Sequence, residues 1–349
     1  MSSSSRFLQR IKVAAENQRL ITPKPLTVKE VFDLVRVDLE KVEKEFCRQT
    51  VSSIEAITEI GQYLQVSGGK RLRPVLVLLA SKLCGFEGDP AIRMGAAYEM
   101  IHSATLVHDD VIDKAETRRG QPSINSRWGN HMSVLAGDWL YMQAFSIALA
   151  ERNFKILDLL IGLTQVMVEG ELLQLAYLQK DDLTEDDYFE LTYRKTACLF
   201  SACLRTGALL ADRPEEEENL LSSYGINLGL AFQLIDDVLD FTSSEKKLGK
   251  PVGNDLREGK VTLPMIYLLQ MCTPEDARKV LRISQDGGFE NVAFAEVLEM
   301  VERYGALDAA RKKAKEFAAE AKRCLRIFPE SVYKDALMSL PDFIIARES

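Results

Sequence analysis

Runs of apolar residues at helical spacing constrain the fold of this 349-residue chain more than any other feature. In residues 26–50 apolar side chains recur every three or four positions, as in the series Val28, Val31, Phe32 and Val35, which is the period of one face of an α-helix. Alternating period-2 runs, which would indicate strands, are scarce. Similar apolar runs predict helices over residues 74–83, 91–113, 133–151, 155–179, 186–210, 215–240, 263–270, 292–304 and 307–327. The pattern therefore predicts an all-α fold.

The breaks between these runs are short and polar, and none is long enough to be a linker between two domains. Thr27 followed by Glu30 resembles a capping box at the start of the first helix. We expect residues 25–349 to form a single domain, a bundle of about ten or more helices around a central cavity. Residues 1–24, which begin Ser-rich and basic, are expected to be a loosely ordered extension.

The composition argues against several classes of protein. A net charge of −8 argues against a nucleic-acid partner, because such a protein needs a basic surface to displace counterions. No stretch reaches the roughly 18 apolar residues of a transmembrane helix. The six cysteines form no C-x-x-C pair, so we interpret them as reduced thiols and expect a cytoplasmic location. The Ser-rich start would also suit an organellar transit peptide.

Two copies of one acidic motif, DDVID and DDVLD, each end an apolar run. The six carboxylates are Asp109, Asp110, Asp113, Asp236, Asp237 and Asp240. Positions i and i+4 share one face of a helix, so the first and last carboxylates of each copy repel each other unless a cation lies between them. Mg²⁺ suits carboxylate oxygens and commonly joins them to substrate phosphates. The repetition favours facing helices that hold several Mg²⁺ ions, up to three, around a diphosphate, over two solvated helix ends.

A Gly-rich basic segment, residues 68–74 (GGKRLRP), precedes another apolar run. The glycines let the backbone approach an anion, while Lys70, Arg71 and Arg73 supply three cations. A helix is expected to begin near Pro74. The segment is a candidate diphosphate cradle, and a basic loop that caps a helix is the alternative.

Further polar residues lie close to these motifs in the sequence. Arg118 and Arg119 follow the first acidic motif and could fold back over a phosphate, because a planar guanidinium suits phosphate oxygens. Gln233 precedes the second motif by three residues and shares a helix face with it. Taken singly, each could equally be a surface turn or a locally satisfied polar group. The remaining candidates are Lys195, Thr196, Lys250, Lys260 and, less strongly, the histidines His102, His108 and His131.

Together these motifs resemble the trans-isoprenyl diphosphate synthases, the polyprenyl synthetase family, and in particular its long-chain octaprenyl and solanesyl types. The matching segments follow the family's order: GGKRLRP, DDVID with RRG after it, the Lys195–Thr196 pair, FQLIDDVLD and GKPVGNDLREGK. They span residues 68–260, and the general pattern covers most of the chain. The resemblance implies an isoprenoid-synthase type of fold. It also implies a Mg²⁺-dependent prenyltransferase that joins isopentenyl diphosphate to an allylic diphosphate.

The resemblance also implies roles for individual residues. The main Mg²⁺ ligands would be Asp109, Asp113 and Asp236, with Asp110, Asp237 and Asp240 nearby. The allylic diphosphate would be held by Arg118, Lys195 and Lys250, with Lys260 closing the pocket. Isopentenyl diphosphate would be bound by Lys70, Arg73, His102 and Arg119. The reacting centre would be lined by Thr196 and Gln233.

The helix that ends in the first acidic motif is also expected to form a wall of the tunnel into which the product grows. Residues four or five positions before Asp109 lie roughly 6–7.5 Å deeper along a helix. In family members with short products, large side chains occupy those places. Here they hold Thr105 and Ala104, and Ile101 lies deeper still. We therefore expect a long product, C30–C50, such as a quinone side-chain precursor. Candidates for the tunnel floor are Phe145, Phe154, Leu160 and Met167.

Three alternatives stay open on the sequence alone. They are a short-chain synthase of the farnesyl or geranylgeranyl type, a terpene cyclase, and a non-catalytic subunit of a heteromeric prenyltransferase. A cyclase does not need GGKRLRP, and non-catalytic subunits typically lose aspartates from one motif, whereas both are intact here. By resemblance we expect a homodimer whose product could pass to a membrane enzyme.

Overall fold

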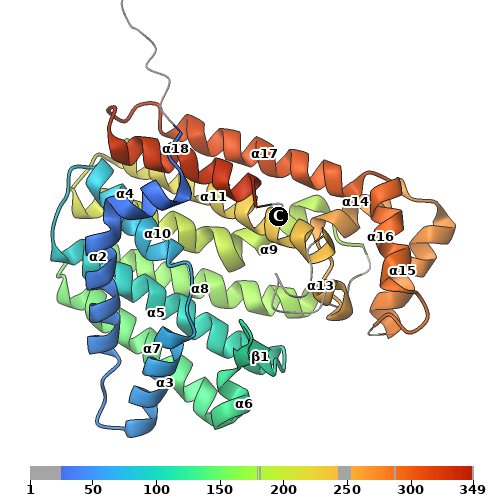
Figure 1. The fold of residues 1–349 in the computed structure, drawn as a ribbon, viewed down its shortest axis with the longest axis horizontal. Helices are drawn as coiled ribbons and strands as arrows, with labels where there is room; N and C mark the ends of the chain where they lie inside the picture. Colours follow the sequence, from blue (N-terminus) through green and yellow to red (C-terminus); the bar gives the residue numbers. More distant parts are fainter. Residues whose placement is uncertain (1–24, 179, 181, 243–252, 287, 348–349) are drawn as a thin grey trace, which may run out of the picture.

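The computed structural model describes residues 25–178, 180, 182–242, 253–286 and 288–347, and helices make up most of this part of the chain (Figure 1). The expected all-α bundle of ten or more helices is confirmed. The expected extension, residues 1–24, and Lys250 lie outside the described residues. The first half of the bundle contains α2 (Val28–Gln49), α3 (Glu55–Val66), α4 (Leu72–Leu83), α5 (Asp89–Ile112), α6 (Ile124–Trp128), α7 (Asn130–Ala150) and α8 (Phe154–Tyr177).

The second half continues with α9 (Glu185–Thr192), the π-helical segment η1 (Tyr193–Ala197), α10 (Cys198–Leu210), α11 (Glu215–Thr242), α13 (Asn254–Arg257), α14 (Leu263–Met271), α15 (Pro274–Asp286), α16 (Phe294–Arg303), α17 (Ala306–Cys324) and α18 (Val332–Ile345). Within the described residues the only sheet is a two-stranded hairpin, β1 (Thr117–Arg118) with β2 (Gln121–Pro122). Within the same residues, no helix is both long and apolar enough to cross a membrane. All six cysteine thiols are free.

Every helix that the apolar runs predict is present, with ends that shift by a few residues. The capping box at Thr27 is also present, because its hydroxyl accepts from the Glu30 N–H and the Glu30 carboxylate accepts from the Thr27 N–H. The apolar pattern did not predict α3, α15 and α18, nor the short helices α6 and α13. α3 buries few side chains, and α15 is largely polar. In α18 an interior proline, Pro341, argues against a helix when only the sequence is read.

The helix expected over residues 186–210 is interrupted at its middle. Five residues of η1 adopt π-helical geometry between α9 and α10, and Lys195 and Thr196 are two of them. π-Helical bulges are rare inside helices and occur often at functional sites. The extra residue in the turn changes which side chains face the interior at this point, and nothing in the apolar pattern predicts it.

The main core lies where α4, α5, α10 and α11 pack together, and Tyr98, Phe200 and Tyr224 are among its largest fully buried side chains. Glycines allow α11 to approach its neighbours closely. A Cβ atom on Gly225 would lie 2.6 Å from Ser201 Cα, and one on Gly229 would lie 2.6 Å from Ala197 Cα. This close packing brings the middle of α11 against η1, which positions Gln233 beside Thr196.

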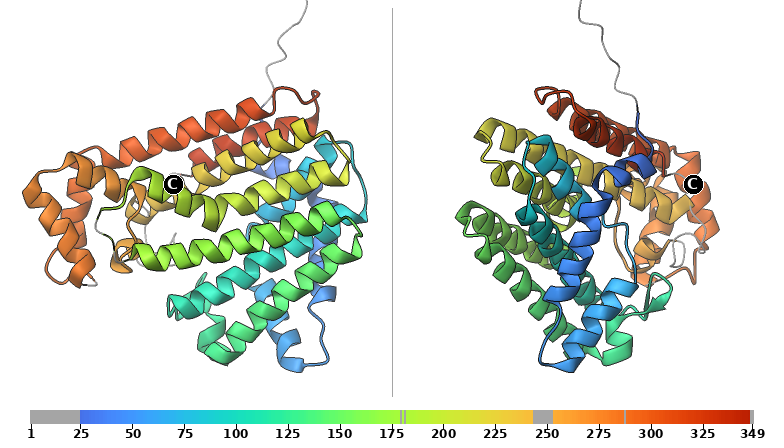
Figure 2. Two further views of the ribbon diagram at one scale, coloured as in Figure 1. Left: turned by 180° about the vertical axis from the view of Figure 1, so that it is seen from behind. Right: turned by 60° about the vertical axis from the view of Figure 1, so that its left-hand side comes forward.

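A second, smaller apolar cluster joins α13–α16 to the ends of α11 and α17. Figure 1 shows α15 and α16 as a lobe at one end of the bundle, and α17 and α18 along the top of the bundle. α11 and α17 contribute side chains to both clusters, for example Ile235 and Val238 of α11. In the view from behind in Figure 2, the green α7 and α8 run side by side across the opposite face.

Candidate active site

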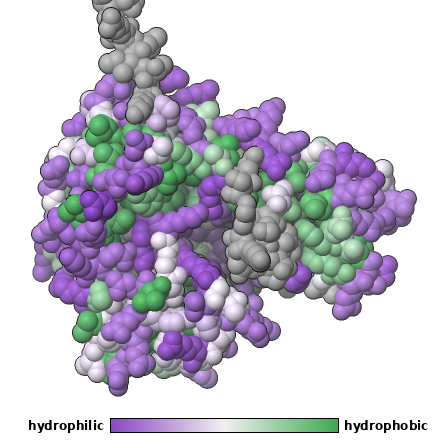
Figure 3. All heavy atoms as spheres, in the orientation of Figure 1, coloured by the Kyte–Doolittle hydropathy of each residue, from purple (hydrophilic) through white to green (hydrophobic). Residues whose placement is uncertain are grey.

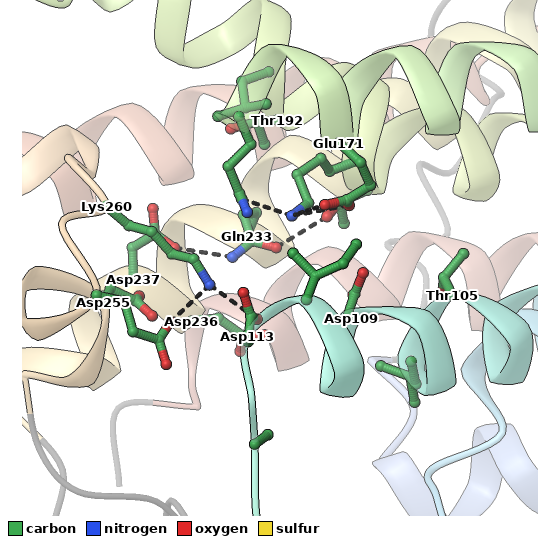
Figure 4. A pocket seen from close by; sticks show the side chains of 18 of the residues that line it. Thr105, Asp109, Asp113, Glu171, Thr192, Gln233, Asp236, Asp237, Asp255 and Lys260 are labelled. Atoms are coloured by element: carbon green, nitrogen blue, oxygen red, sulfur yellow. Dashed lines mark hydrogen bonds and ion pairs between the residues drawn. The ribbon is translucent and has the colours of Figure 1, made fainter. Parts of the chain in front are cut away.

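A cavity of about 1850 Å³ opens among α4, α5, α8, α9, η1 and α11. Figure 3 shows a hollow in the middle of one face, with hydrophilic residues around it. The carboxyl ends of α5 and α11, which carry the two acidic motifs, both reach this cavity. Most residues proposed from the sequence therefore lie together. Figure 4 shows the aspartates of the two helices on neighbouring sides of the cavity.

The first acidic motif ends α5. Asp109 and Asp113 line the cavity, and Asp113 is the residue that caps the helix. Burial and the nearby Glu171 raise the pKa of Asp109 to about 7. Asp110 points the other way: it is 2% exposed and is bound by the guanidinium of Arg118, with Nε 2.7 Å from Oδ1. The resemblance places Asp110 near the metal ions, whereas the structure uses it to hold Arg118 at the cavity edge.

The second motif lies inside α11 and is arranged differently. Asp236 and Asp237 line the cavity, but Asp240 is 1% exposed and is not part of the lining. One oxygen of Asp240 accepts from the N–H of Asp255, and its backbone carbonyl accepts from Gly253. The resemblance assigns Asp240 a place near the ions, whereas in this structure its side chain is buried outside the cavity lining. α11 continues to Thr242, so its last turn packs Asp240 against the segment that begins α13.

Cations from distant segments balance the carboxylates of the cavity. Lys260 lies 3.2 Å from Asp113, and Figure 4 shows it reaching across to α5. Arg347, near the C-terminal end, lies 3.0 Å from Asp236 and over the ring of Phe232. Mg²⁺ bound by one or two carboxylates and by substrate phosphates would fit such oxygens. Among the described residues, no three acidic, histidine or cysteine side chains form a ready-made metal cage, so phosphate oxygens would have to complete the shell.

The other end of the cavity is basic. Its lining includes Lys70, Arg73, His102 and Arg119, the set that the resemblance assigns to isopentenyl diphosphate. Burial and the adjacent arginines, Arg73 above all, hold the pKa of His102 well below its usual range, so the imidazole is neutral at pH 7. Burial also lowers the pKa of Arg73, whose guanidinium lies over the ring of Phe200.

Backbone geometry orients two arginines beside this basic region. Arg119 and Gly120 form the turn of the hairpin, both with positive φ, and the Arg119 guanidinium donates to the Gly68 carbonyl. Arg71 has φ 48° and is bound to Glu43 and, at 2.9 Å, to Glu99. Arg71 is thus tied down by two carboxylates. Lys70 and Arg73 of the same segment also line the cavity, and within the part of the chain that the structure describes no carboxylate holds them in an ion pair.

The π-helical segment carries Lys195 and Thr196 into the cavity. The ammonium of Lys195 donates to Glu171 and, at 2.6 Å, to Gln174. The hydroxyl of Thr196 donates to the Gln233 carbonyl oxygen over 3.0 Å. Thr196 and Gln233, both predicted from the sequence, therefore lie in contact, although they are 37 positions apart.

The tunnel wall agrees with the sequence expectation only in part. Thr105 lines the cavity, whereas Ala104 and Ile101 are fully buried and do not. At 3.6 residues per turn, the residue four positions before Asp109 stays beneath it, while those five and eight before rotate toward the core. Of the four floor candidates, only Met167 is in the lining. Phe145 and Leu160 pack in the core, and Phe154 is 69% exposed.

Several lining residues were not predicted from the sequence: Glu171, Gln174, Tyr188, Thr192 and Arg347. A signal existed for the first two, because they are polar residues three positions apart in a mostly apolar helix. Tyr188 is 6% exposed and resembles any core aromatic residue. Nothing in the sequence connects Arg347 with a motif more than a hundred residues earlier. His108 also lines the cavity, whereas His131 is exposed and absent from the lining.

Residues 54–301, which include every residue of the cavity lining except Arg347, match the family described as polyprenyl synthetase. The chain belongs to this family. As a member it is a prenyltransferase that makes trans-prenyl diphosphates. The solved polyprenyl synthase of Caulobacter crescentus CB15, complexed with calcium and isoprenyl diphosphate, is similar over 93% of this chain and 99% of its own. Its sequence identity is 36% and its TM-score 0.89.

Relatives of both product classes are similar to this polyprenyl synthetase. The octaprenyl diphosphate synthase of Escherichia coli K12 is 36% identical over 323 residues, which is 93% of this chain and 100% of that enzyme. The short chain isoprenyl diphosphate synthase of Methanothermobacter thermautotrophicus is also 36% identical, over 91% of this chain and 99% of that enzyme. Overall similarity therefore leaves the product length open.

Proposed function

We propose that the protein is a Mg²⁺-dependent long-chain trans-polyprenyl diphosphate synthase. It would add isopentenyl diphosphate head to tail onto an allylic diphosphate primer, giving a C30–C50 product. The observation that carries the proposal is that one cavity combines an acidic region, a basic region and an apolar wall with a small residue, Thr105, beneath Asp109. These regions suit two diphosphates and a growing hydrocarbon chain.

The acidic region is the proposed site of ionisation. The C1–O bond of the allylic diphosphate breaks, and its electron pair leaves with pyrophosphate. Mg²⁺ on Asp109, Asp113 and Asp236 would offset the charge that develops on the leaving group. Lys195, Arg118, Lys260 and Lys250 would hold the same phosphates. One charge pair at about 4 Å contributes roughly 4 kcal/mol at an effective dielectric near 20, so several contacts are a large share of the barrier.

The basic region is the proposed site of isopentenyl diphosphate. Lys70, Arg73 and Arg119 would bind its phosphates, and the neutral imidazole of His102 would contribute a hydrogen bond. The double bond of isopentenyl diphosphate attacks the allyl cation, forming a carbon–carbon bond. A proton then leaves the new cation for pyrophosphate. Apolar walls keep water from trapping the cation during these steps.

The product length is proposed from the wall below Asp109. Thr105 and Met167 line the cavity and come from different helices, α5 and α8. A large ring at position 105 would block the space beneath the acidic region. We expect Thr105→Phe to give products shorter by several isoprene units. Ala104→Phe is the matched control, because Ala104 is 0% exposed and outside the lining. It would destabilise the core and leave the product length of the folded fraction unchanged.

A homodimer is proposed from the outer face of α7 and α8. Both helices carry apolar side chains on every side among a few polar ones, and such helices are typically covered by protein. Their exposed apolar side chains are Val134, Leu135, Met142, Leu149, Phe154, Ile161, Val168, Leu172, Leu175 and Leu178. The last four also line the cavity, so a second copy on this face would close its side.

The dimer proposal has a direct test. Leu135 is 62% exposed and outside the cavity lining. Leu135→Glu should yield a monomer in size-exclusion chromatography with light scattering. Val66→Glu on α3, at a residue that is 85% exposed, should leave the mass unchanged. A Leu135→Glu variant that keeps the mass of two chains would contradict the proposal.

The activity is tested with purified protein, Mg²⁺, farnesyl diphosphate and labelled isopentenyl diphosphate, followed by sizing of the products. Products of C30–C50 are expected. Geranylgeranyl diphosphate as the sole product would favour the short-chain alternative. No incorporation of label would contradict the proposed synthase altogether.

A further inference from the structure

A continuous chain of hydrogen bonds connects three elements in the wall of the cavity. The hydroxyl of Tyr188, on α9, donates to Asp237 Oδ2 over 2.6 Å. The amide Nε2 of Gln233, also on α11, donates to Asp237 Oδ1 over 2.9 Å, and Thr196 of η1 donates to Gln233 Oε1 over 3.0 Å. Figure 4 shows Gln233 with its bond to Asp237.

We propose that Tyr188 is a positioning residue for the condensation, acting through Asp237 to fix the amide of Gln233 and, with it, the hydroxyl of Thr196. The inference rests on the proposed function of the cavity. It concerns a residue to which neither the sequence motifs nor the proposed mechanism gives a role. Tyr188 is 6% exposed and its hydroxyl is bonded to Asp237, so it acts on the reacting atoms through other residues.

The geometry explains why one hydroxyl has this effect. Asp237 is 3% exposed, so its two oxygens depend on buried partners. Tyr188 holds one oxygen, which keeps the other aimed at Gln233. Gln233 then donates from its NH₂ group to Asp237 and accepts at its oxygen from Thr196, and this pair of bonds defines one orientation of the amide. A flipped amide would lose the bond that its NH₂ group donates to Asp237 Oδ1.

The consequence for the reaction lies in the cavity lining. Thr196 and Gln233 both line it, on the side that the acidic region shares with η1. With its hydrogen committed to Gln233, the Thr196 oxygen has lone pairs available for a positive charge in the cavity. Preorganised dipoles of this kind stabilise a developing cation without reorganisation at the moment of reaction. Without the Tyr188 hydroxyl, Asp237 can rotate and the amide loses its single orientation.

The chain provides a matched control for the test. Tyr98 is also a buried tyrosine, 0% exposed, and its hydroxyl bonds Thr206 over 2.6 Å in the core. It is not part of the cavity lining. Tyr188→Phe and Tyr98→Phe each remove one buried hydrogen bond, so both should lower the melting temperature by similar amounts. Only a residue that positions the reacting groups should also change turnover.

The experiment measures kcat and both KM values for the two variants with Mg²⁺, farnesyl diphosphate and isopentenyl diphosphate. We expect Tyr188→Phe to lower kcat about ten- to a hundredfold, the size of loss that a small misplacement causes. Its KM values should stay within about twofold, and Tyr98→Phe should keep the kcat of the unmodified protein. An unchanged kcat in Tyr188→Phe, or a loss confined to KM, would overturn the proposal.

A second comparison tests the route through Gln233. In a Gln233→Leu background the relay is already broken, so adding Tyr188→Phe should change kcat by less than about twofold, because residues in one network are not additive. If Tyr188→Phe lowered kcat equally in the unmodified protein and in the Gln233→Leu variant, the proposed route through Gln233 would be overturned. Failure of the unmodified protein to elongate would remove the proposed function together with this inference. Elongation with an insensitive Tyr188 would remove the inference alone.

Discussion

The two acidic motifs have nearly the same sequence, yet the structure gives their last aspartates opposite surroundings. α5 ends at Ile112, so Asp113 caps the helix, lines the cavity and faces Lys260. α11 runs on to Thr242, so Asp240 lies inside the helix, is 1% exposed and binds the backbone of Asp255. The point at which each helix ends therefore decides which carboxylates can meet a cation.

The middle aspartates differ in a similar way. Asp110 is bound by an arginine, Arg118, whose two nitrogen atoms lie within 2.7 Å of one of its oxygens. Among the described residues, the partners of Asp237 are the neutral donors Tyr188 and Gln233. Burial raises the pKa of both carboxyls, and the hydrogen-bond partners oppose the rise, namely the cation Arg118 at Asp110 and the neutral Tyr188 and Gln233 at Asp237. A repeated motif thus supplies carboxylates, and the neighbouring elements decide what each does.

The largest effect is expected when the last aspartate of each motif, Asp113 or Asp240, is substituted and the two variants are compared. Asp113→Asn should lower kcat/KM by about 10²–10³-fold, because it removes charge aimed at the leaving group. Asp240→Asn should lower it less than about tenfold and instead cost about 1–2 kcal/mol of unfolding free energy, through the bond to Asp255. Steady-state kinetics and denaturant unfolding check both. Equal losses of kcat/KM in the two variants would contradict the proposed difference between Asp113 and Asp240.

Metal binding should also distinguish Asp113→Asn from Asp240→Asn, with a smaller effect. Mg²⁺ with pyrophosphate, at about 100 times its dissociation constant, should stabilise the metal-free protein by about 2.7 kcal/mol, because it binds only the folded state. Asp113→Asn should lose most of this gain in thermal unfolding, and Asp240→Asn should keep it. A loss of this stabilisation in Asp240→Asn would show that the Asp240 carboxylate contributes to binding the ions.

The smallest expected effect is on the pH dependence of stability. Burial, and then the charge of Asp255, raises the pKa of Asp237 to about 8, against about 3.9 in an unfolded chain. The folded protein therefore holds this proton more tightly. The stabilisation is complete below about pH 4 and is lost as the pH rises through about 8.

Asp237→Asn removes this titration. The melting temperature of the metal-free variant should then fall less than that of the unmodified protein between about pH 6 and pH 8.5. Asp110→Asn is the control, since it removes a carboxyl whose raised pKa is opposed by Arg118. Parallel curves for Asp237→Asn and the unmodified protein would show that Asp237 does not titrate in this range.

Much of the fold could be read from the sequence because long helices repeat their apolar residues at a fixed period. That signal predicted α2, α4, α5, α7, α8, α11 and α17. It failed for α3 and α15, which bury few side chains. It also gave no sign of the π-helical turn at Lys195 and Thr196, because one extra residue in a turn leaves an apolar run intact.

The sequence by itself determined which chemical groups the cavity contains: two sets of carboxylates, a basic Gly-rich segment and the Lys195–Thr196 pair. Spacing along one helix is a local property, so the residues alone specify it. Only the tertiary structure decided that Asp240 and Asp110 turn away, that Thr105 and not Ala104 faces the cavity, and that Tyr188 and Arg347 belong to the site. These outcomes depend on where helices end and on which distant segments pack against them, and no local pattern encodes such contacts.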